Sequence, residues 1–202
     1  MFAIEPWFAG CRVVIIGGGT SVTPKQIHSI AKARLDLGSK TRVIAINDAI
    51  FLAWWADWLH ACDGKWWRWY VQHVEGFKGI RTTLAEDIPE GWAHRLKNTG
   101  KDGFDPDPSC VRTGHNGGYQ AMHSAIHAGA REIVLVGIDM DKSTHWFGKH
   151  PNDIELDRAA LMLPKFEGLI PELTARGIKV WNASPISTIQ HWPKVDIDAI
   201  LR

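Results

Sequence analysis

Two glycine-rich clusters have the composition of phosphate-binding turns. The first is Gly17-Gly18-Gly19-Thr20-Ser21, and the second is Thr113-Gly114-His115-Asn116-Gly117-Gly118. Glycine lets backbone N–H groups approach an anion without an obstructing Cβ, and threonine and serine add hydroxyl donors. We therefore expect nucleotide or phosphate contacts from Gly17, Gly18, Gly19, Thr20, Ser21, Thr113, Gly114, Asn116, Gly117 and Gly118.

The second cluster comes directly before a predicted helix over residues 119–128. Glycine is a poor helix former, so we place the cluster at or before the helix start. The exposed N–H groups and the positive end of the helix would then make an anion site. The alternative is that Thr113 and Asn116 merely cap the helix.

Four polar residues follow predicted strands and complete a candidate site. Asp63 and Asp139 could bind a ribose, hold Mg²⁺ against a diphosphate or act as a base, and either could instead cap a loop. Asn47 and Asp48 follow another strand, and Asp48 falls roughly where a ribose-binding acid would stand. These positions favour a nucleotide ligand.

The polar loop after Asp139 contains His145 and His150. A histidine at the ligand edge can deprotonate an acceptor hydroxyl near neutral pH, although a solvent-exposed ring is an equally good interpretation. His123 and His127 have an i,i+4 spacing that can bind metal, but the metalloprotease pattern HExxH is absent and a packed pair is favoured.

Several familiar motifs are missing from the sequence. Val22 stands where the dinucleotide fingerprint needs its third glycine, which leaves an NAD(P)-linked oxidoreductase as a minor alternative. There is no GxxxxGK[ST] loop for a P-loop ATPase, no GxSxG nucleophile elbow and no CxxC pair.

The elements that position these residues alternate between strands and helices. Apolar, β-branched runs predict strands, and the spacing of apolar residues between them predicts helices. Thr23, Pro24 and Gln26 form a capping box that starts the first helix, and Gly38 should close it. The predicted strands are 12–16, 42–46, 58–62, 132–136 and 178–181, with 79–84 as a further candidate, and helices are expected over 119–128 and 154–176.

This order indicates an α/β fold: a Rossmann-like, doubly wound, mostly parallel sheet in one domain over residues 1–202. The predicted strands stop at the polar or glycine-rich tips GGGTS, ND, DG, GID and NAS. In open parallel sheets such tips share one edge, where ligands bind. Ordinary turn chemistry explains any one tip, but five together favour a site.

The composition limits the classes of partner. The chain of 202 residues has 23 Lys+Arg and 22 Asp+Glu, a net charge of +1 that argues against general binding of nucleic acid or an anionic membrane. The three cysteines and the absence of a signal peptide favour the cytoplasm. A tryptophan-rich region around Asp63 predicts core packing, with a homo-oligomer contact or ligand stacking as alternatives.

The order and spacing of these short motifs resemble a known superfamily. The matching features are the strand into GGGTS, the strands ending at Asn47 and at Cys62-Asp63, the turn from Thr113 to Tyr119, and the strand ending in Gly137-Ile138-Asp139. The chain resembles the superfamily that joins archaeal 6-hydroxymethyl-dihydropterin diphosphokinases to bacterial CMP-sialic-acid-dependent sialyltransferases, with uncharacterised phage proteins of similar length.

The resemblance implies a Rossmann-like nucleotide-binding fold in which the first glycine loop and Asn47 hold the nucleotide. It also implies a base downstream of the Gly-x-Asp strand, for which His150 is the candidate. We therefore expect a nucleotide-dependent transferase, foremost a glycosyltransferase-like enzyme with a nucleotide-sugar donor. The alternatives are a pyrophosphokinase that uses ATP with Mg²⁺ on the aspartates and a non-catalytic, nucleotide-sequestering protein of phage type.

Overall fold

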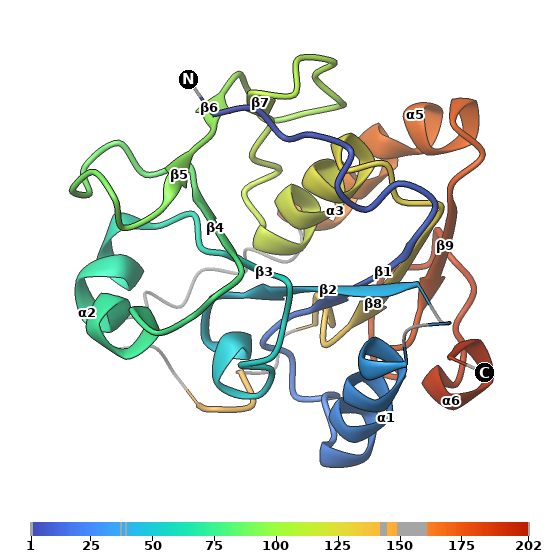
Figure 1. Cartoon of the computed structure of the whole chain (residues 1–202). Helices are drawn as coiled ribbons and strands as arrows, with labels where there is room; N and C mark the ends of the chain where they lie inside the picture. Colours follow the sequence, from blue (N-terminus) through green and yellow to red (C-terminus); the bar gives the residue numbers. More distant parts are fainter. Residues whose placement is uncertain (1, 37, 39, 142–144, 149–160, 202) are drawn as a thin grey trace.

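The computed structural model describes residues 2–36, 38, 40–141, 145–148 and 161–201. Within these residues a seven-stranded sheet, in which each strand pairs in parallel with its neighbours, forms the centre of the molecule (Figure 1). The strand order is β5-β4-β3-β2-β1-β8-β9. The strands are β1 (Arg12–Ile16), β2 (Thr41–Ile46), β3 (Trp58–His60), β4 (Ile80–Thr83), β5 (His94–Arg95), β8 (Glu132–Val136) and β9 (Lys179–Asn182).

The strand order reverses between β1 and β8. The chain first builds outward from β1 to β5 on one side, then returns to place β8 against the other side of β1. The register pairs Ile16 with Ala45 of β2 and with Val136 of β8, so the three strands end at one level. In sheets of this kind ligands bind at the reversal point, outside the carboxyl ends.

Helices cover both faces of the sheet, which confirms the expected doubly wound α/β fold. Alternate residues of β1 enter different cores: Val13 and Ile15 pack on one face, and Val14 and Ile16 on the other. Figure 1 shows α3 (Gly117–His127) and α5 (Ile170–Ala175) on one face and α1 (Pro24–Leu35) and α6 (Ile197–Ile200) on the other. The strands therefore read as continuous apolar runs because both of their faces are buried.

The first helix begins as its sequence predicts. Thr23 accepts a hydrogen bond from the Gln26 N–H at 3.2 Å, and the Gln26 side chain accepts one from the Thr23 N–H at 2.9 Å. The same Gln26 side chain donates to the Ala183 carbonyl at 2.9 Å and so attaches α1 to the end of β9. The helix ends at Leu35, three residues before the predicted closure at Gly38.

Several elements differ from the prediction. Strand β3 stops at His60 rather than at residue 62, and α3 begins at Gly117, so both final glycines of the second cluster lie inside the helix. Residues 154–160 of the predicted last helix lie outside the described residues, and Leu163–Leu169 forms a 3₁₀ helix (η2). The additional elements are η1 (Asn47–Phe51), α2 (Gly64–Val74) and a separate pair, β6 (Lys97–Asn98) and β7 (Cys110–Val111).

The tryptophan-rich region divides between core and surface. Trp58, Trp66 and Trp67 are buried, whereas Trp54 and Trp69 keep about two fifths of their surface exposed. Packing therefore accounts for three of these side chains, and an oligomer contact through the exposed ones stays a prediction. No helix in the described part of the chain has the length and apolar character needed to cross a membrane.

Candidate functional site

The first glycine loop lies against the end of β8. The N–H of Gly17 donates to the Val136 carbonyl at 2.8 Å, and the N–H of Gly19 donates to the Gly137 carbonyl at 2.8 Å. These bonds continue the β1–β8 pairing past the ends of both strands. The amides of Gly17 and Gly19 therefore serve the protein's own carbonyls, and the expected phosphate cradle cannot be built from them in this conformation.

The loop after β1 and the residues after β8 approach each other closely, which explains why glycine occupies positions 17 and 19. A Cβ on Gly17 would lie 2.6 Å from the Gly137 carbonyl oxygen, and a Cβ on Gly19 would lie 2.7 Å from the same atom. Both distances are shorter than any real Cβ contact. Close backbone packing at the switch point, rather than left-handed backbone geometry, therefore requires these glycines.

Asp139 fixes the end of the same loop. Its carboxylate accepts a hydrogen bond from the Ser21 N–H at 2.9 Å and a second from the Ser21 hydroxyl. Asp139 is buried, so these two donors satisfy a charge that water cannot reach freely. The structure thus joins Ser21 and Asp139 and gives Asp139 a structural role, whereas its role in binding or catalysis stays a prediction.

The segment 145–148 lies over the first glycine loop. The Trp146 N–H donates to the Gly18 carbonyl at 2.9 Å, and His145 forms an isolated antiparallel β-bridge with Gly19. A Cβ on Gly18 would lie 2.9 Å from Nδ1 of His145. The imidazole of His145 therefore covers the loop, while Thr20 remains exposed beside it.

The second glycine cluster caps its own helix. Asn116 Oδ1 accepts from the N–H groups of Gly118 at 2.7 Å and Tyr119 at 3.1 Å, which is the capping alternative named above. The N–H groups of Thr113 and Gly114 donate to carbonyls of the preceding loop. Within the described residues, Gly117 is the one member of this cluster whose N–H has no hydrogen bond in the structure.

The two glycine clusters nevertheless meet. A Cβ on Gly118 would lie 3.0 Å from Cδ1 of Ile138, and a Cβ on Gly17 would collide with the same methyl group. A Cβ on Gly117 would lie 2.7 Å from Cγ2 of Ile46, the last residue of β2. Both clusters therefore lie at one edge of the sheet, around the ends of β1, β2 and β8.

Asn47 occupies this edge with an unsatisfied acceptor. It follows β2 with a left-handed φ of 50°, a conformation that asparagine tolerates better than most residues. Its Oδ1 is buried and has no hydrogen-bond partner within the described residues. Such an atom costs free energy unless a donor reaches it, which makes Asn47 a candidate ligand contact.

Asp48 lies in η1 and its carboxylate faces Trp66 of α2. Its carboxylate accepts a hydrogen bond from Nε1 of Trp66 at 3.0 Å, and the side chain is only 5% exposed. Burial and the nearby Asp48 carboxylate raise the pKa of Tyr70. Asp48 thus holds α2 through its aromatic residues, a partner that sequence reasoning does not supply.

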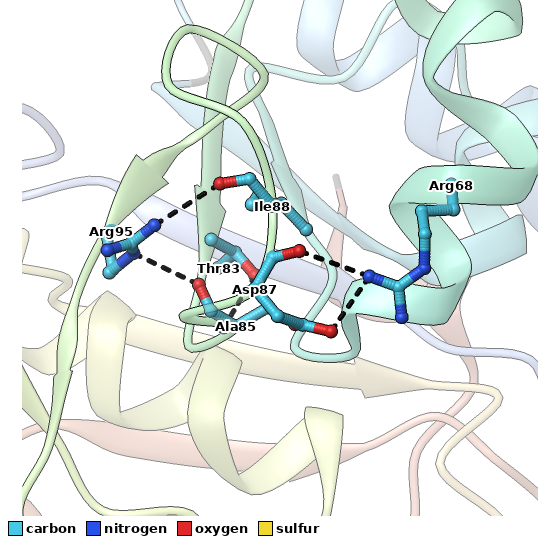
Figure 2. A network of polar contacts seen from close by, with 6 residues as sticks. All are labelled: Arg68, Thr83, Ala85, Asp87, Ile88 and Arg95. Carbon is cyan, nitrogen blue, oxygen red and sulfur yellow. Dashed lines mark hydrogen bonds and ion pairs between the residues drawn. The ribbon is translucent and has the colours of Figure 1, made fainter.

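Asp63 lies at the start of α2 and is exposed. A Cβ on Gly64, the next residue, would collide with the carboxylate of Asp87. Figure 2 shows Asp87 held by Arg68 of α2, whose guanidinium donates to the Asp87 carboxylate at 2.8 Å, while Arg95 donates to the Ala85 carbonyl at 3.1 Å. The Arg68 guanidinium lowers the pKa of Asp87. Asp87 therefore supplies negative charge at the amino end of α2.

A buried polar chain supports the second cluster, and the sequence analysis missed it. Nε2 of His60 lies 2.8 Å from Oε1 of Gln120, whose Nε2 donates to the Thr113 carbonyl at 2.9 Å. Nδ1 of His60 lies 2.9 Å from the Thr82 hydroxyl, which accepts from Trp58. Burial lowers the pKa of His60. The sequence offered one indication of this chain, namely His60 among the apolar residues of a predicted strand.

Cys62 lies beside this chain. Burial raises the pKa of its thiol to about 12, and the neighbouring Asp63 carboxylate adds to the effect. The thiol therefore stays protonated near neutral pH and is a poor nucleophile. All three cysteines are free.

The segment after β9 completes the edge and was also missed. The Ile138 N–H donates to the Ser184 hydroxyl at 3.1 Å, and the Ser187 hydroxyl donates to the Ile138 carbonyl at 2.8 Å. The Thr188 N–H donates to the Asp139 carbonyl at 2.8 Å. These residues fix the Gly137-Ile138-Asp139 tip from its far side. The hydroxyl-rich run from Ser184 to Thr188 was the signal in the sequence.

The remaining candidates contribute less to the described site. His150 lies outside the described residues. His123 and His127 pack against Phe104 with ring centroids 4.4 Å and 4.7 Å away, as favoured from the sequence. No group of three His, Cys, Asp or Glu side chains gathers in a metal-binding arrangement among the residues that the structure describes.

Comparison with known proteins places the fold. No family model matches the sequence, and no curated protein matches it. Among solved structures the chain is similar to the sialyltransferase CstII from Campylobacter jejuni in complex with a substrate analogue, cytidine-5'-monophosphate, with a TM-score of 0.54 and 13% identity over 93% of this chain and 85% of that chain. At this identity the likeness shows a shared sialyltransferase-like fold, the Rossmann-like architecture expected from the sequence.

Proposed function

We propose that this protein is a nucleotide-dependent transferase of the glycosyltransferase type, with a nucleotide-sugar donor bound at the edge formed by the ends of β1, β2 and β8. The fold shared with a sialyltransferase that binds cytidine-5'-monophosphate supports this proposal. The observation that carries it is the buried Oδ1 of Asn47 at the carboxyl end of β2, which has no hydrogen-bond partner among the residues that the structure describes.

A nucleotide supplies the donor that this oxygen lacks. A buried amide oxygen without a partner costs roughly 1–3 kcal/mol, and the protein recovers that free energy when a ligand N–H or O–H reaches it. Exocyclic amino groups of bases and ribose hydroxyls are such donors. Apolar ligands carry none, so this position favours a nucleoside over a purely apolar ligand.

The neighbouring groups suit the phosphate and the reaction. The exposed residue Thr20 and the Gly117 N–H are the contacts we assign to phosphate oxygens. In glycosyl transfer an acceptor hydroxyl attacks the anomeric carbon, the nucleotide phosphate leaves, and a base takes the hydroxyl proton. We assign the base to His150, and Asp63 to acceptor contact at the exposed rim.

A binding experiment with a matched pair of variants tests the proposal. Isothermal titration should show CMP or UDP binding without metal, at least tenfold weakened by Asn47→Gly, which keeps the left-handed backbone and removes only the amide. Lys40→Gly changes another left-handed position, with φ of 48°, and should leave binding unchanged.

Other outcomes would assign the site differently. Binding of ATP only with Mg²⁺, which needs just one or two carboxylates plus phosphates, would favour the pyrophosphokinase and contradict a sugar donor. A protein that binds nucleotide, turns over no acceptor in a broad screen and keeps the same nucleotide affinity in His150→Asn would be a sequestering protein. An absence of nucleotide binding would overturn both.

A further inference from the structure

A cavity of about 470 Å³ lies between α1 and the segment that follows η1. Most of the residues that line it are apolar: Val22, Pro24, Ile27, Ala31, Leu52, Trp55 and Trp146. This volume lies within the range of small-molecule sites, roughly 300–1,000 Å³.

The cavity adjoins the proposed donor site. Val22 directly follows the first glycine loop. Its Cγ2 lies against Gly137, because a Cβ built on Gly137 would collide with that methyl group. Trp146, another residue that lines the cavity, donates its backbone N–H to the Gly18 carbonyl at 2.9 Å. The residues that hold the glycine loop therefore also form the walls of the cavity.

The walls offer few polar groups to a ligand. Thr23 also lines the cavity, but its hydroxyl and N–H are bonded to Gln26 in the capping box of α1. His28 is the one titratable residue among those that line it. A charged or hydroxyl-covered ligand would lose hydration here and find few replacement hydrogen bonds.

We propose that this cavity binds an uncharged aromatic group belonging to the acceptor substrate. Two tryptophans among the lining residues suit a planar ring, because aromatic pairs gain stacking or edge-to-face contact beyond their buried area. A nucleobase fits less well, because its polar edge needs hydrogen-bond partners. This inference rests on the proposed function, and it specifies an acceptor that carries its hydroxyl near an aryl group.

A fluorescent probe tests the cavity directly. N-phenyl-1-naphthylamine, an uncharged aromatic fluorophore, should bind saturably to the full chain with one site. Ala31→Glu introduces a charge into the apolar wall and should weaken binding at least tenfold. Leu35→Glu is its matched control one turn further along the same helix, at a side chain that is 70% exposed, and should change nothing.

A second pair of variants tests the cavity in case Ala31→Glu does not fold. Trp146→Ala removes an aromatic wall and should weaken probe binding, whereas Trp69→Ala, at a similarly exposed tryptophan on α2, should not. 2-Naphthol should displace the probe, and neither hexanol nor lactose should do so at the same concentration.

Three results would overturn the inference: no saturable binding, equal effects of the cavity variants and their controls, or displacement of the probe by lactose or by CMP. Titration of the same samples with CMP separates the two proposals. If CMP or UDP binds but the probe does not, only the aromatic acceptor is contradicted. If the unmodified protein binds no nucleotide at all, the proposed function is contradicted.

Discussion

The carboxylate of Asp139 accepts hydrogen bonds from both the N–H and the hydroxyl of Ser21, residues that lie 118 positions apart in the chain. This contact joins the first glycine loop to the tip of β8 across the switch point of the sheet. Because a carboxylate acceptor strengthens both bonds, the loop conformation depends on this pair.

Ser21→Ala should destabilise the protein measurably. The substitution removes the hydroxyl donor and leaves one oxygen of a buried carboxylate less well satisfied, at a cost of about 1–2 kcal/mol. Urea denaturation should show this as a lower midpoint. Ser29→Ala is the control, because it makes the same substitution on α1, away from Asp139. Equal midpoints for the two variants would contradict a structural role for the pair.

Gly17→Ala should also destabilise the fold. The added Cβ would lie 2.6 Å from the Gly137 carbonyl oxygen, and backbone atoms in a buried tip cannot move aside cheaply. We expect a loss of about 1–3 kcal/mol, as for other overpacked cores. Gly76→Ala is the matched control, because its Cβ would meet nothing nearer than Trp54 at 3.7 Å. That variant should be neutral or slightly more stable, since alanine restricts the unfolded chain.

The central strands and the meeting of the glycine-rich tips follow directly from the sequence. The apolar runs at 12–16 and 132–136 are long enough to predict buried strands, and their glycine tips lie where the sheet order reverses. Such local patterns suffice because a strand buried on both faces needs little else.

The use of each polar group could not be predicted in the same way. Whether the Gly17 N–H faces a ligand or a carbonyl depends on Val136, and the role of Asp48 depends on Trp66. Val136 lies far from Gly17 in the sequence, and Trp66 lies on α2, a helix that the sequence analysis did not predict. The two-residue strands β5, β6 and β7 were missed because they exist only through pairing with other segments.

The buried histidine on α3 should make stability depend on pH. Burial lowers the pKa of His123 to about 4, whereas the unfolded residue titrates near 6.5. Below pH 6.5 the unfolded chain binds a proton that the folded chain does not, so stability is fully present above that pH and is lost as the pH falls toward 4. The expected loss from His123 alone between pH 7 and pH 5 is about 2 kcal/mol.

Denaturation at several pH values checks this dependence. His123→Gln should flatten the slope of unfolding free energy between pH 7 and pH 5, even if it lowers stability throughout. His73→Gln, at an exposed position on α2, should leave the slope unchanged. An unaltered slope in His123→Gln would show that other groups cause the acid sensitivity.

The hydrogen-bond chain at His60 predicts one tautomer. Because Nε2 of Gln120 donates to the Thr113 carbonyl, Oε1 of Gln120 faces His60 and can only accept. Nε2 of His60 must therefore carry the proton, and Nδ1 accepts from the Thr82 hydroxyl. Nitrogen NMR of the imidazole should show the neutral Nε2–H form, and this form should persist to a pH below the usual histidine pKa because burial lowers the pKa of His60.

Gln120→Leu removes the acceptor for His60 and the donor to Thr113 together. The variant should therefore lose the preference for the Nε2–H tautomer and loosen the Thr113 turn, and nucleotide binding should weaken with it. Ser124→Ala on the same buried helix, whose hydroxyl bonds only to the Gln120 carbonyl at 2.9 Å, should change neither. An Nδ1–H signal in the unmodified protein would mean that the Thr113 carbonyl is held by some other donor.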